Sequence, residues 1–489
     1  MNPLPRMKTP LALALALALA GCAVGPRYEA PPAVETPVAF KEGPGEWVRA
    51  TPADALERGA WWQLFQDPRL DELAAQVEVS NQNVAAAVAA YRQARALVAE
   101  QRAALFPTVS LDGGVSRRGT GGGGNNVATT TATTTGGITR VGSGDRTSYQ
   151  FDIGASWEPD VWGRLERTVD SARAGEQASL ADLAAARLAA QGELAANYFN
   201  LREQDLQLAL LSRTIAGYER VLQITRNRYE AGIAARTDVL QAQTQLANAR
   251  AELLGLERQR AQLEHAIAVL VGRAPANFSL PPEPEWRAAV PDVPPALPST
   301  LLQRRPDIAA AERRVAQANE QIGIAQSAWY PSLRLTGSAG AGAASIGDLF
   351  SASSLVWALG ASLAQTIFDA GATAARVEGA RAGLDAAAAR YRQTVLSAFQ
   401  DVEDQLAGVR VLAQQVALRE EAARDAELVE QQVLNRYQAG QVGFTEVINA
   451  QATAQNARRA LVQLQSDRQA AAVALVQALG GGWSGLAAP

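Results

Sequence analysis

The sequence has almost none of the residues that bind metals or form disulfide bridges. Cys22 is the only cysteine and His265 the only histidine among 489 residues. One cysteine cannot form a disulfide within the chain, and no His/Cys cluster offers a metal site. We therefore expect neither a metal nor a cofactor.

Long apolar runs and a strong charge of either sign are also missing. Beyond the N-terminus there is no run of about eighteen apolar residues, so the sequence predicts no transmembrane helix. Charged residues make up 19% and hydrophobic residues 48% of the chain, which excludes a disordered tail and a polytopic helical membrane protein. The net charge of -4 argues against nucleic acid as a partner.

The N-terminus contains the features of a lipoprotein signal. Arg6 and Lys8 precede the apolar run Leu11–Ala20, which is too short to cross a bilayer because that needs about twenty residues. The run leads into Leu-Ala-Gly-Cys, and we favour acylation of Cys22 over the alternative of a small core residue. Residues 1–21 are then the signal peptide.

One short segment occurs twice, 208 residues apart. RYEAGIAARTDVLQAQ (Arg228–Gln243) and RYQAGQVGFTEVINAQ (Arg436–Gln451) are identical at eight of sixteen positions. The repetition predicts two structural repeats, each with the order helix, strand, loop, strand, long helix, turn, long helix. We expect an N-terminal segment (22–65), a first repeat (66–273), a linker with eight prolines (274–298), a second repeat (299–479) and a tail (480–489).

The long helices should pack side by side. No proline occurs from Arg164 to Tyr229, and apolar residues there recur every three or four positions, as in helices that cross at shallow angles. Such a helix spans about 95 Å at about 1.5 Å per residue. A compact globule of this chain length has a radius of gyration of only about 23 Å. We therefore expect an elongated molecule.

Four segments alternate between apolar residues and small or polar ones. Alternation over about ten residues suits a strand of an outer-membrane barrel, and equally a soluble sheet with one solvated face. The lipoprotein signal favours the membrane. The Gly/Thr-rich connector 119–147 cannot bury a core and is expected to be a loop. The segments cover 109–116, 149–157, 332–339 and 357–363.

The repeated segment predicts a turn between two helices. Gly232 and Gly440 each follow a long helical run, where a residue with positive φ can end a helix. Five residues later comes a threonine followed by an acid, which suits an N-cap and the positive end of a helix dipole. The threonines are Thr237 and Thr445, and the acids are Asp238 and Glu446.

At this level of detail the chain resembles the TolC-type outer-membrane efflux proteins, in the lipoprotein branch that includes OprM and NodT. The resemblance rests on GCAVGPRYEAPP (Gly21–Pro32), WWQLFQDPRLDEL (Trp61–Leu73), SWEPDVWGRLER (Ser156–Arg167), the stretch Arg304–Leu333 and both hairpins. It implies a mixed, mainly α fold: an elongated trimeric tube with a twelve-stranded outer-membrane β-barrel, four strands per chain, continued by a periplasmic α-helical barrel.

The resemblance also implies a role and partners. The protein would be the passive outer-membrane channel of a tripartite efflux system in a Gram-negative bacterium, lipid-anchored and extending into the periplasm. A periplasmic adaptor and an inner-membrane pump, often of the resistance-nodulation-division type, would deliver small molecules to it. Neither composition nor motif identifies the cargo.

In this family, gate acids lie just beyond the hairpin glycine. The matching positions here are Asp238, Glu446 and Asn449; Asn449 departs from a second acid, and Val442 stands where some relatives carry a gate arginine. We predict that the acids, with Tyr229 and Tyr437 at the preceding helix ends, narrow the entrance and favour cations. The alternative is that the acids only stabilise helix starts.

The sequence favours the channel over an enzyme and over two other functions. Gly121–Gly124 lacks the Lys-Ser/Thr of a phosphate loop, and His265 has Val473 as its repeat counterpart, so an enzyme is not expected. A coiled-coil periplasmic adaptor lipoprotein should lack the four alternating strands. A type I protein-secretion conduit is the nearest alternative, against which the lipid anchor and the motifs favour small-molecule efflux.

Overall fold

The computed structural model describes residues 24–29, 39–42, 60–118, 146–287, 289–291 and 304–481. Cys22 and nearly all of the Gly/Thr-rich loop lie outside these residues. The chain forms two compact units. The first, called the strand unit, comprises 1–28, 96–173 and 317–384; the second, called the helical unit, comprises 29–95, 174–316 and 385–489.

The two predicted repeats are confirmed, with the same element order and helices of equal length. In each repeat, a helix of 22 residues and two strands precede a helix of 67 residues and a helix of 35 residues, and matching long helices begin 208 residues apart. The first repeat contains α4 (Gln82–Ala103), β1 (Thr108–Arg118), β2 (Arg146–Trp157), α5 (Arg164–Glu230) and α6 (Arg236–Leu270). The second contains α8 (Pro306–Ser327), β3 (Ser332–Ala343), β4 (Leu355–Ala364), α9 (Ala372–Gln438) and α10 (Phe444–Ala478).

The long helices α5 and α9 have 67 residues each, which is about 100 Å of helix at about 1.5 Å per residue. Both are free of proline, and a carboxylate caps each start. Asp160 Oδ2 accepts from the Glu166 amide at 2.7 Å, and Asp369 accepts from the amides of Gly371 and Thr373. No helix in the described part of the chain is long and apolar enough to cross a membrane.

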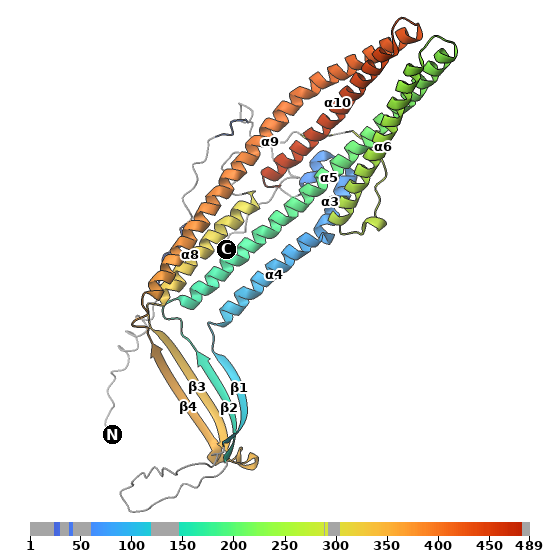
Figure 1. The fold of residues 1–489 in the computed structure, drawn as a ribbon. Helices are drawn as coiled ribbons and strands as arrows, with labels where there is room; N and C mark the ends of the chain where they lie inside the picture. Colours follow the sequence, from blue (N-terminus) through green and yellow to red (C-terminus); the bar gives the residue numbers. More distant parts are fainter. Residues whose placement is uncertain are drawn as a thin grey trace, which may run out of the picture. The chain divides into compact units, whose positions relative to one another are not determined.

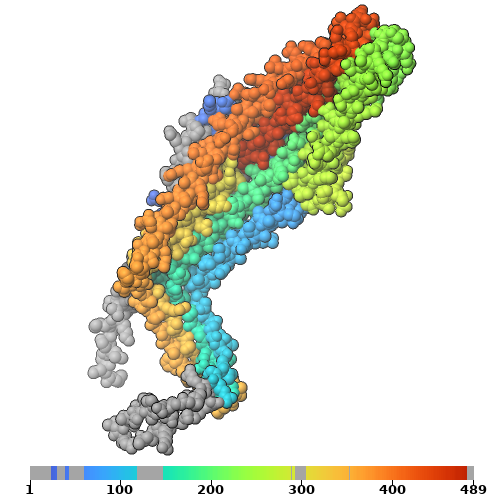
Figure 2. All heavy atoms as spheres, in the orientation of Figure 1, coloured from blue at the N-terminus to red at the C-terminus, as the bar shows by residue number. Residues whose placement is uncertain are grey.

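Within the helical unit, each long helix is paired with its shorter successor. α6 returns alongside α5, and α10 returns alongside α9 (Figure 1). The atoms of α10 lie between those of α9 and those of α5 and α6 on the face shown in Figure 2. The predicted apolar track is buried here, since Leu194, Tyr198 and Leu201 are fully enclosed.

A segment that precedes α4 packs on α5 and belongs to the same core, because its buried residues cluster with Leu194, Tyr198 and Leu201. It begins with the 3-10 helix η1 (Trp61–Phe65) and α3 (Pro68–Ser80). Asp67 Oδ1 accepts from the first amides of α3, while its Oδ2 accepts from the Tyr198 hydroxyl at 2.8 Å and from Trp286 Nε1 at 3.1 Å. One carboxylate thus joins the start of α3, the middle of α5 and the linker between the repeats.

The described part of the proline-rich linker begins with the 3-10 helix η2 (Pro275–Asn277) and is bound to the longer helices. Arg202 and Arg260 converge on the buried carboxylate of Asp205, at 2.9 and 2.6 Å. The same arginines donate to the carbonyls of Pro281 and Leu280. Because each buried charge here has an opposite charge and hydrogen bonds, the cost of desolvation is offset and the linker is fixed in place.

The four strands form one antiparallel sheet in the order β1-β2-β3-β4. The predicted alternation is confirmed by the register: Leu111 lies opposite Ile153, Ile153 opposite Ala339, and Ala339 opposite Trp357. These residues share one apolar face, and the serines, the aspartates and every threonine except Thr147 share the other. Two short 3-10 helices, η3 (Ile346–Asp348) and η4 (Ala352–Ser354), connect β3 to β4.

Candidate functional site

The two hairpin turns of the helical unit have the same backbone conformation. Gly232 and Gly440 both have a φ of 75°. In each turn the amide after the glycine donates to the carbonyl five residues back, from Ile233 to Arg228 at 2.8 Å and from Gln441 to Arg436 at 2.9 Å. This 6→1 bond is the mark of a Schellman motif, in which a left-handed residue terminates a helix.

The predicted N-caps of the returning helices are wrong. α6 begins at Arg236 and α10 at Phe444, so the capping positions are Ala235 and Gly443, neither of which makes a side-chain cap. Thr237 and Thr445 therefore lie inside the first turns. The acids Asp238 and Glu446 also lie in the first turns, where a negative charge is favoured by the free amides and the helix dipole.

The two tyrosines at the helix ends occupy different environments. Tyr229 is 44% exposed, whereas Tyr437 is 2% exposed. The Tyr437 hydroxyl lies 3.2 Å from Thr225 Oγ1 of α5, and its ring lies 5.6 Å from that of Phe444. Tyr437 is therefore a contact between the two hairpins of one chain, while Tyr229 remains available at the surface of this chain.

Arg228 of α5 completes this contact, and the sequence analysis did not single it out. Its guanidinium lies 4.7 Å from the centroid of the Tyr437 ring and donates to the Tyr437 carbonyl at 2.5 Å. A cation at the C-terminal end of a helix is favoured by the free carbonyls there. Arg228, Thr225 and Tyr437 form what we call the inter-hairpin clasp. Only the contact with the other repeat distinguishes Arg228 from its exposed counterpart Arg436.

The three polar positions beyond the glycines lie at the surface of the chain. Glu446 and Asn449 are exposed and Asp238 is partly exposed. Among the described residues, neither carboxylate forms an ion pair. Val442, at the position of the gate arginine of some relatives, instead packs against the apolar cluster beneath the hairpins. The first-turn acids are thus free charges near two adjacent helix starts.

An open groove of about 680 Å³ runs between the hairpins, lined by α5, α6 and α10. Its walls are rich in neutral polar side chains. Arg459 pairs with Glu252 across it, and Thr214 donates to Gln455 at 2.8 Å. The polar lining residues include Gln241, Thr244, Gln245, Asn248, Thr445, Gln455 and Asn456.

The sheet of the strand unit presents an exposed apolar face and two free edges. Leu359 is 81% exposed and Trp357 70% exposed, values that no soluble core would give. Among the described residues, β1 and β4 each have one strand neighbour, so each has an edge whose backbone groups this part of the chain leaves unpaired. An exposed apolar face with open edges indicates that other surfaces cover both.

Two carboxylates lie side by side on the polar face, which the sequence alone did not predict. Asp112 of β1 lies directly opposite Asp152 of β2. A Cβ added at Gly340 would lie 1.9 Å from Asp152 Oδ1, so this glycine leaves the space that the carboxylate occupies. Like charges in this arrangement are destabilising. The alternation assigns both residues to one face, but only the register makes them neighbours.

The first described residues are bound next to the strands, within the strand unit. The Val24 amide donates to the Trp162 carbonyl at 3.1 Å, and Arg167 donates to the Pro26 carbonyl at 3.2 Å. Arg167 also pairs with Glu320 of α8 at 2.7 Å. Cys22, the predicted lipid attachment site, lies outside the described residues, two positions before Val24.

No group of three or more His, Cys, Asp or Glu side chains in the described ranges could hold a metal ion. His265 is exposed on α6, and its counterpart Val473 is buried in α10. The helical unit instead has paired hairpin tips with a groove between them, and the strand unit has an apolar sheet with open edges.

Comparison with known proteins agrees over almost the whole chain. A family model described as outer membrane efflux protein matches residues 73–273 and 297–481. The antibiotic efflux pump outer membrane protein ArpC of Pseudomonas putida is 31% identical over 483 residues, 97% of this chain and 96% of that protein. The pyoverdine export outer membrane protein OpmQ of Pseudomonas aeruginosa is 30% identical over 454 residues, 92% and 94% of the two chains.

Solved structures give the same result. The outer-membrane channel OprN superposes with a TM-score of 0.83 at 28% identity. The match covers 95% of this chain and 100% of the OprN chain. The open state of the Neisseria gonorrhoeae MtrE outer membrane channel gives a TM-score of 0.80 at 30% identity, with 94% and 98% covered.

Proposed function

The chain belongs to the outer membrane efflux protein family, and we propose that three copies of it form a passive conduit through which a pump expels small toxic molecules. It is an outer-membrane efflux channel protein, so the location in the outer membrane and the role in efflux that the sequence predicted are confirmed. The family and its named relatives are channel and efflux proteins rather than enzymes. Subunit number, partners, anchor and gate are the proposed parts.

One observation carries the proposal: the sheet exposes an apolar face and leaves the edges of β1 and β4 unpaired. In lipid each unpaired backbone group costs several kcal/mol, so a four-stranded sheet must close with others. Single-chain bacterial barrels have at least about eight strands. Two copies would give eight strands and three would give twelve, and the family resemblance selects three.

The groove between the hairpins supports the proposed docking of a periplasmic adaptor. Its lining of amides and hydroxyls comes from two parallel stretches of helix, α6 and α10, at the ends of the hairpins. The Arg459–Glu252 pair neutralises the charges within it. Such a surface suits a polar helical hairpin, because helix ridges fit the groove and hydrogen bonds specify the register. An inner-membrane pump of the resistance-nodulation-division type would supply the energy.

The hairpin tips are proposed as the gate. Three chains would bring six first-turn carboxylates, from Asp238 and Glu446, to one end of the tube. Tyr229 and Asn449 are exposed beside them, whereas Tyr437 is enclosed in the clasp and would act by holding the second hairpin against the first. The predicted direct narrowing of the entrance is thus proposed for Tyr229, and an indirect role for Tyr437.

Cys22 is proposed as the lipid attachment site. The chain is bound beside the strands from Val24 onward, so a lipid two residues earlier would lie near the membrane that the strands enter. Globomycin or Cys22→Ala should block acylation and reduce assembly without releasing the protein, because the strands also hold it. An unmodified Cys22 at the mature N-terminus in mass spectra would refute the anchor.

The function is tested by conductance together with drug susceptibility. The purified protein in a planar bilayer should give stable single-channel currents without ATP and without a pump. Cells that lack it should become sensitive to small toxic compounds, and the intact gene should restore resistance. Loss of a secreted protein with unchanged compound resistance would instead assign the chain to a type I secretion system.

A further inference from the structure

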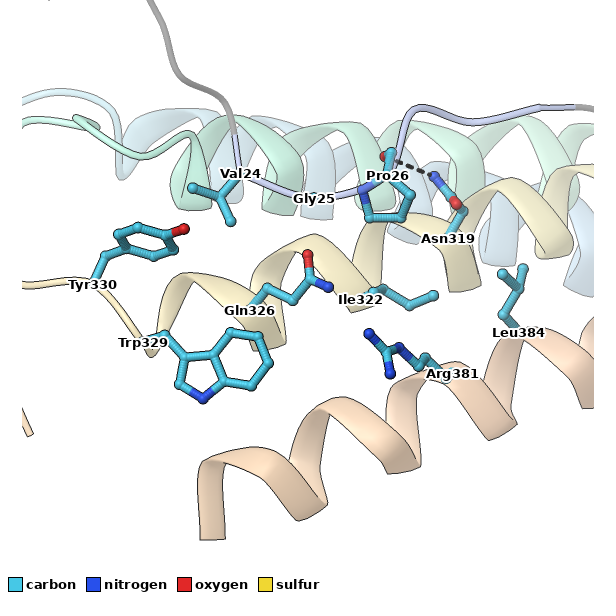
Figure 3. A pocket seen from close by; sticks show the side chains of 10 residues that line it. All are labelled: Val24, Gly25, Pro26, Asn319, Ile322, Gln326, Trp329, Tyr330, Arg381 and Leu384. Atoms are coloured by element: carbon cyan, nitrogen blue, oxygen red, sulfur yellow. Dashed lines mark hydrogen bonds between the residues drawn. The ribbon is translucent and has the colours of Figure 1, made fainter. Parts of the chain in front are cut away.

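A pocket in the strand unit lies directly beside the bases of the strands. It is bounded by the first described residues, the C-terminal half of α8 and the start of α9, and measures about 740 Å³ (Figure 3). Ten side chains or backbone positions line it, and only one of them, Arg381, carries a charge. A cationic pocket with apolar walls requires an explanation, because nothing in the proposed conduit uses it.

The wall formed by the N-terminal segment is held firmly against the helix. Gly25 has a φ of 119°, and a Cβ added there would lie 2.6 Å from the Cα of Gly323 in α8. The backbone therefore approaches α8 as closely as two glycines allow. Arg167 and Asn319 both donate to the Pro26 carbonyl, at 3.2 and 3.5 Å. The pocket has a preformed wall on this side.

Arg381 is available to a ligand. Its only ion pair among the described residues is with Glu378 at 3.8 Å, and both side chains are mostly exposed, at 56% and 76%. Such a pair contributes little in water. The side chain reaches from α9 toward α8, where Gln326 and Ile322 lie (Figure 3). A guanidinium presents a planar fork of N–H donors, which matches the oxygens of a phosphate.

The aromatic residues of the pocket indicate the interface of a membrane. Trp329 and Tyr330 are separated from the start of β3 only by Pro331 and are 46% and 40% exposed. Tyr330 stacks on Trp162, with ring centroids 4.9 Å apart. Tryptophan and tyrosine concentrate where lipid headgroups meet water, because each ring has an apolar body and a polar atom. Ile322 and Leu384 provide apolar surface in the same pocket.

We propose that this pocket binds the headgroup of an anionic phospholipid from the inner leaflet of the outer membrane. Arg381 pairs with the phosphate, Gln326 and Trp329 offer additional N–H donors, and Ile322 and Leu384 contact the first methylenes. The inference rests on the proposed membrane insertion of the strands. The phospholipid is a free membrane component, distinct from any lipid attached to Cys22.

Native mass spectrometry of the detergent-purified assembly tests this assignment. The probes are phosphatidylglycerol and phosphatidylcholine with the same acyl chains, which differ in net charge. The wild-type protein should retain phosphatidylglycerol about tenfold more strongly than phosphatidylcholine, and Arg381→Gln should abolish that preference. Arg376→Gln is the matched control, because it removes the same charge from an exposed position on α9 that does not line the pocket.

Each alternative occupant gives a different result. Displacement of the lipid by millimolar inorganic phosphate would show an anion site without lipid recognition and overturn the proposal. Loss of the preference in Cys22→Ser with Arg381 intact would assign the pocket to the chain's own anchor and also overturn it. Equal retention of phosphatidylglycerol by the wild type and by Arg381→Gln would also overturn the proposal.

A second readout guards against misfolded variants and separates this inference from the channel itself. Brominated phosphatidylglycerol should quench the fluorescence of the wild type more than that of Trp329→Phe. Subunit number and conductance are measured on the same samples. A conducting assembly without lipid preference refutes only the pocket, whereas a wild-type protein that neither assembles nor conducts refutes the proposed function.

Discussion

The two hairpin tips share a backbone but not a set of contacts. Both turns have a glycine at a φ of 75° and the same 6→1 hydrogen bond, yet Tyr229 is exposed and Tyr437 is buried. Arg228 of the first hairpin holds the second, while its counterpart Arg436 is exposed. The repeated sequence thus determines the backbone conformation of the turn, whereas the packing neighbours of a side chain determine its role.

The same lesson holds deeper in the helical unit. Glu203 of α5 is buried, and the residue 208 positions later is Val411, which is 39% exposed. Glu203 accepts from Gln207 Nε2 at 2.6 Å. The repeats therefore differ at positions where they pack against each other, and experiments on matched positions can measure that difference.

The largest expected difference is between the two tyrosines. Tyr437→Ala should lower the free energy of unfolding by about 3 kcal/mol, because it removes a buried ring and leaves a cavity. Tyr229→Ala should change it by no more than about 0.5 kcal/mol, as for other surface substitutions. Chemical denaturation of the detergent-solubilised protein measures both, and equal effects would contradict the asymmetry.

The second largest expected difference is between Arg228 and its counterpart Arg436. Arg228→Met removes charge-assisted hydrogen bonds to the end of α9, worth about 2 kcal/mol, whereas Arg436→Met removes none that the structure shows. Hydrogen exchange should accelerate at the amides of 436–441 in the first variant only. Its resting conductance should also rise if the clasp holds the mouth shut. Arg228→Lys should restore only part of the loss, because an ammonium lacks the delocalised plane that stacks on the Tyr437 ring.

The acids have a smaller effect, on ion preference rather than stability. Replacing both Asp238 and Glu446 with alanine should lower the cation preference in single-channel recordings, because like charges around a narrow mouth attract cations. The change should be largest at low salt, since the screening length grows from about 10 Å at 0.1 M to about 30 Å at 0.01 M. Lower thermal stability with unchanged selectivity would instead support helix stabilisation alone.

The smallest effect concerns Glu203. Burial raises the pKa of its carboxyl above the ordinary 4.5, and the charge of Asp467 acts in the same direction. The folded protein therefore keeps the proton to higher pH than the unfolded chain, so the group favours folding at low pH and this contribution is lost as pH rises. Glu203→Gln should raise the melting temperature at about pH 8 and leave it unchanged near pH 4. Val411→Gln is the matched control, and the change in melting temperature that it causes should be the same at about pH 4 and about pH 8.

Much of the fold could be predicted because it depends on periodicity. Proline-free heptad spacing predicted α5 and its counterpart, and alternation predicted all four strands, since burial of one face imposes both patterns. The helix starts after the turns were placed wrongly. Threonine is a good N-cap, but the Schellman turns require so few residues that Ala235 and Gly443 occupy the capping positions.

The contacts between repeats could not be predicted. Arg228 reads as one of many arginines on a helix surface, and only packing brings it to Tyr437. The opposition of Asp112 and Asp152 depends on strand register, which the loop between them does not reveal. The pocket at Arg381 is closed by a segment about 350 residues earlier in the sequence, so no local pattern could indicate it.

Closure of the sheet between copies of the chain is the central claim, and disulfide cross-linking at the free edges tests it most directly. Thr108 of β1 and Ala364 of β4 lie at the same end of the sheet and on its polar face. Oxidation of a Thr108→Cys/Ala364→Cys protein should give covalent dimers and trimers and nothing larger. The control, Ser156→Cys/Thr336→Cys, joins neighbours within one sheet and should give only monomers. A ladder beyond three, or cross-links confined to single chains, would contradict the trimeric conduit.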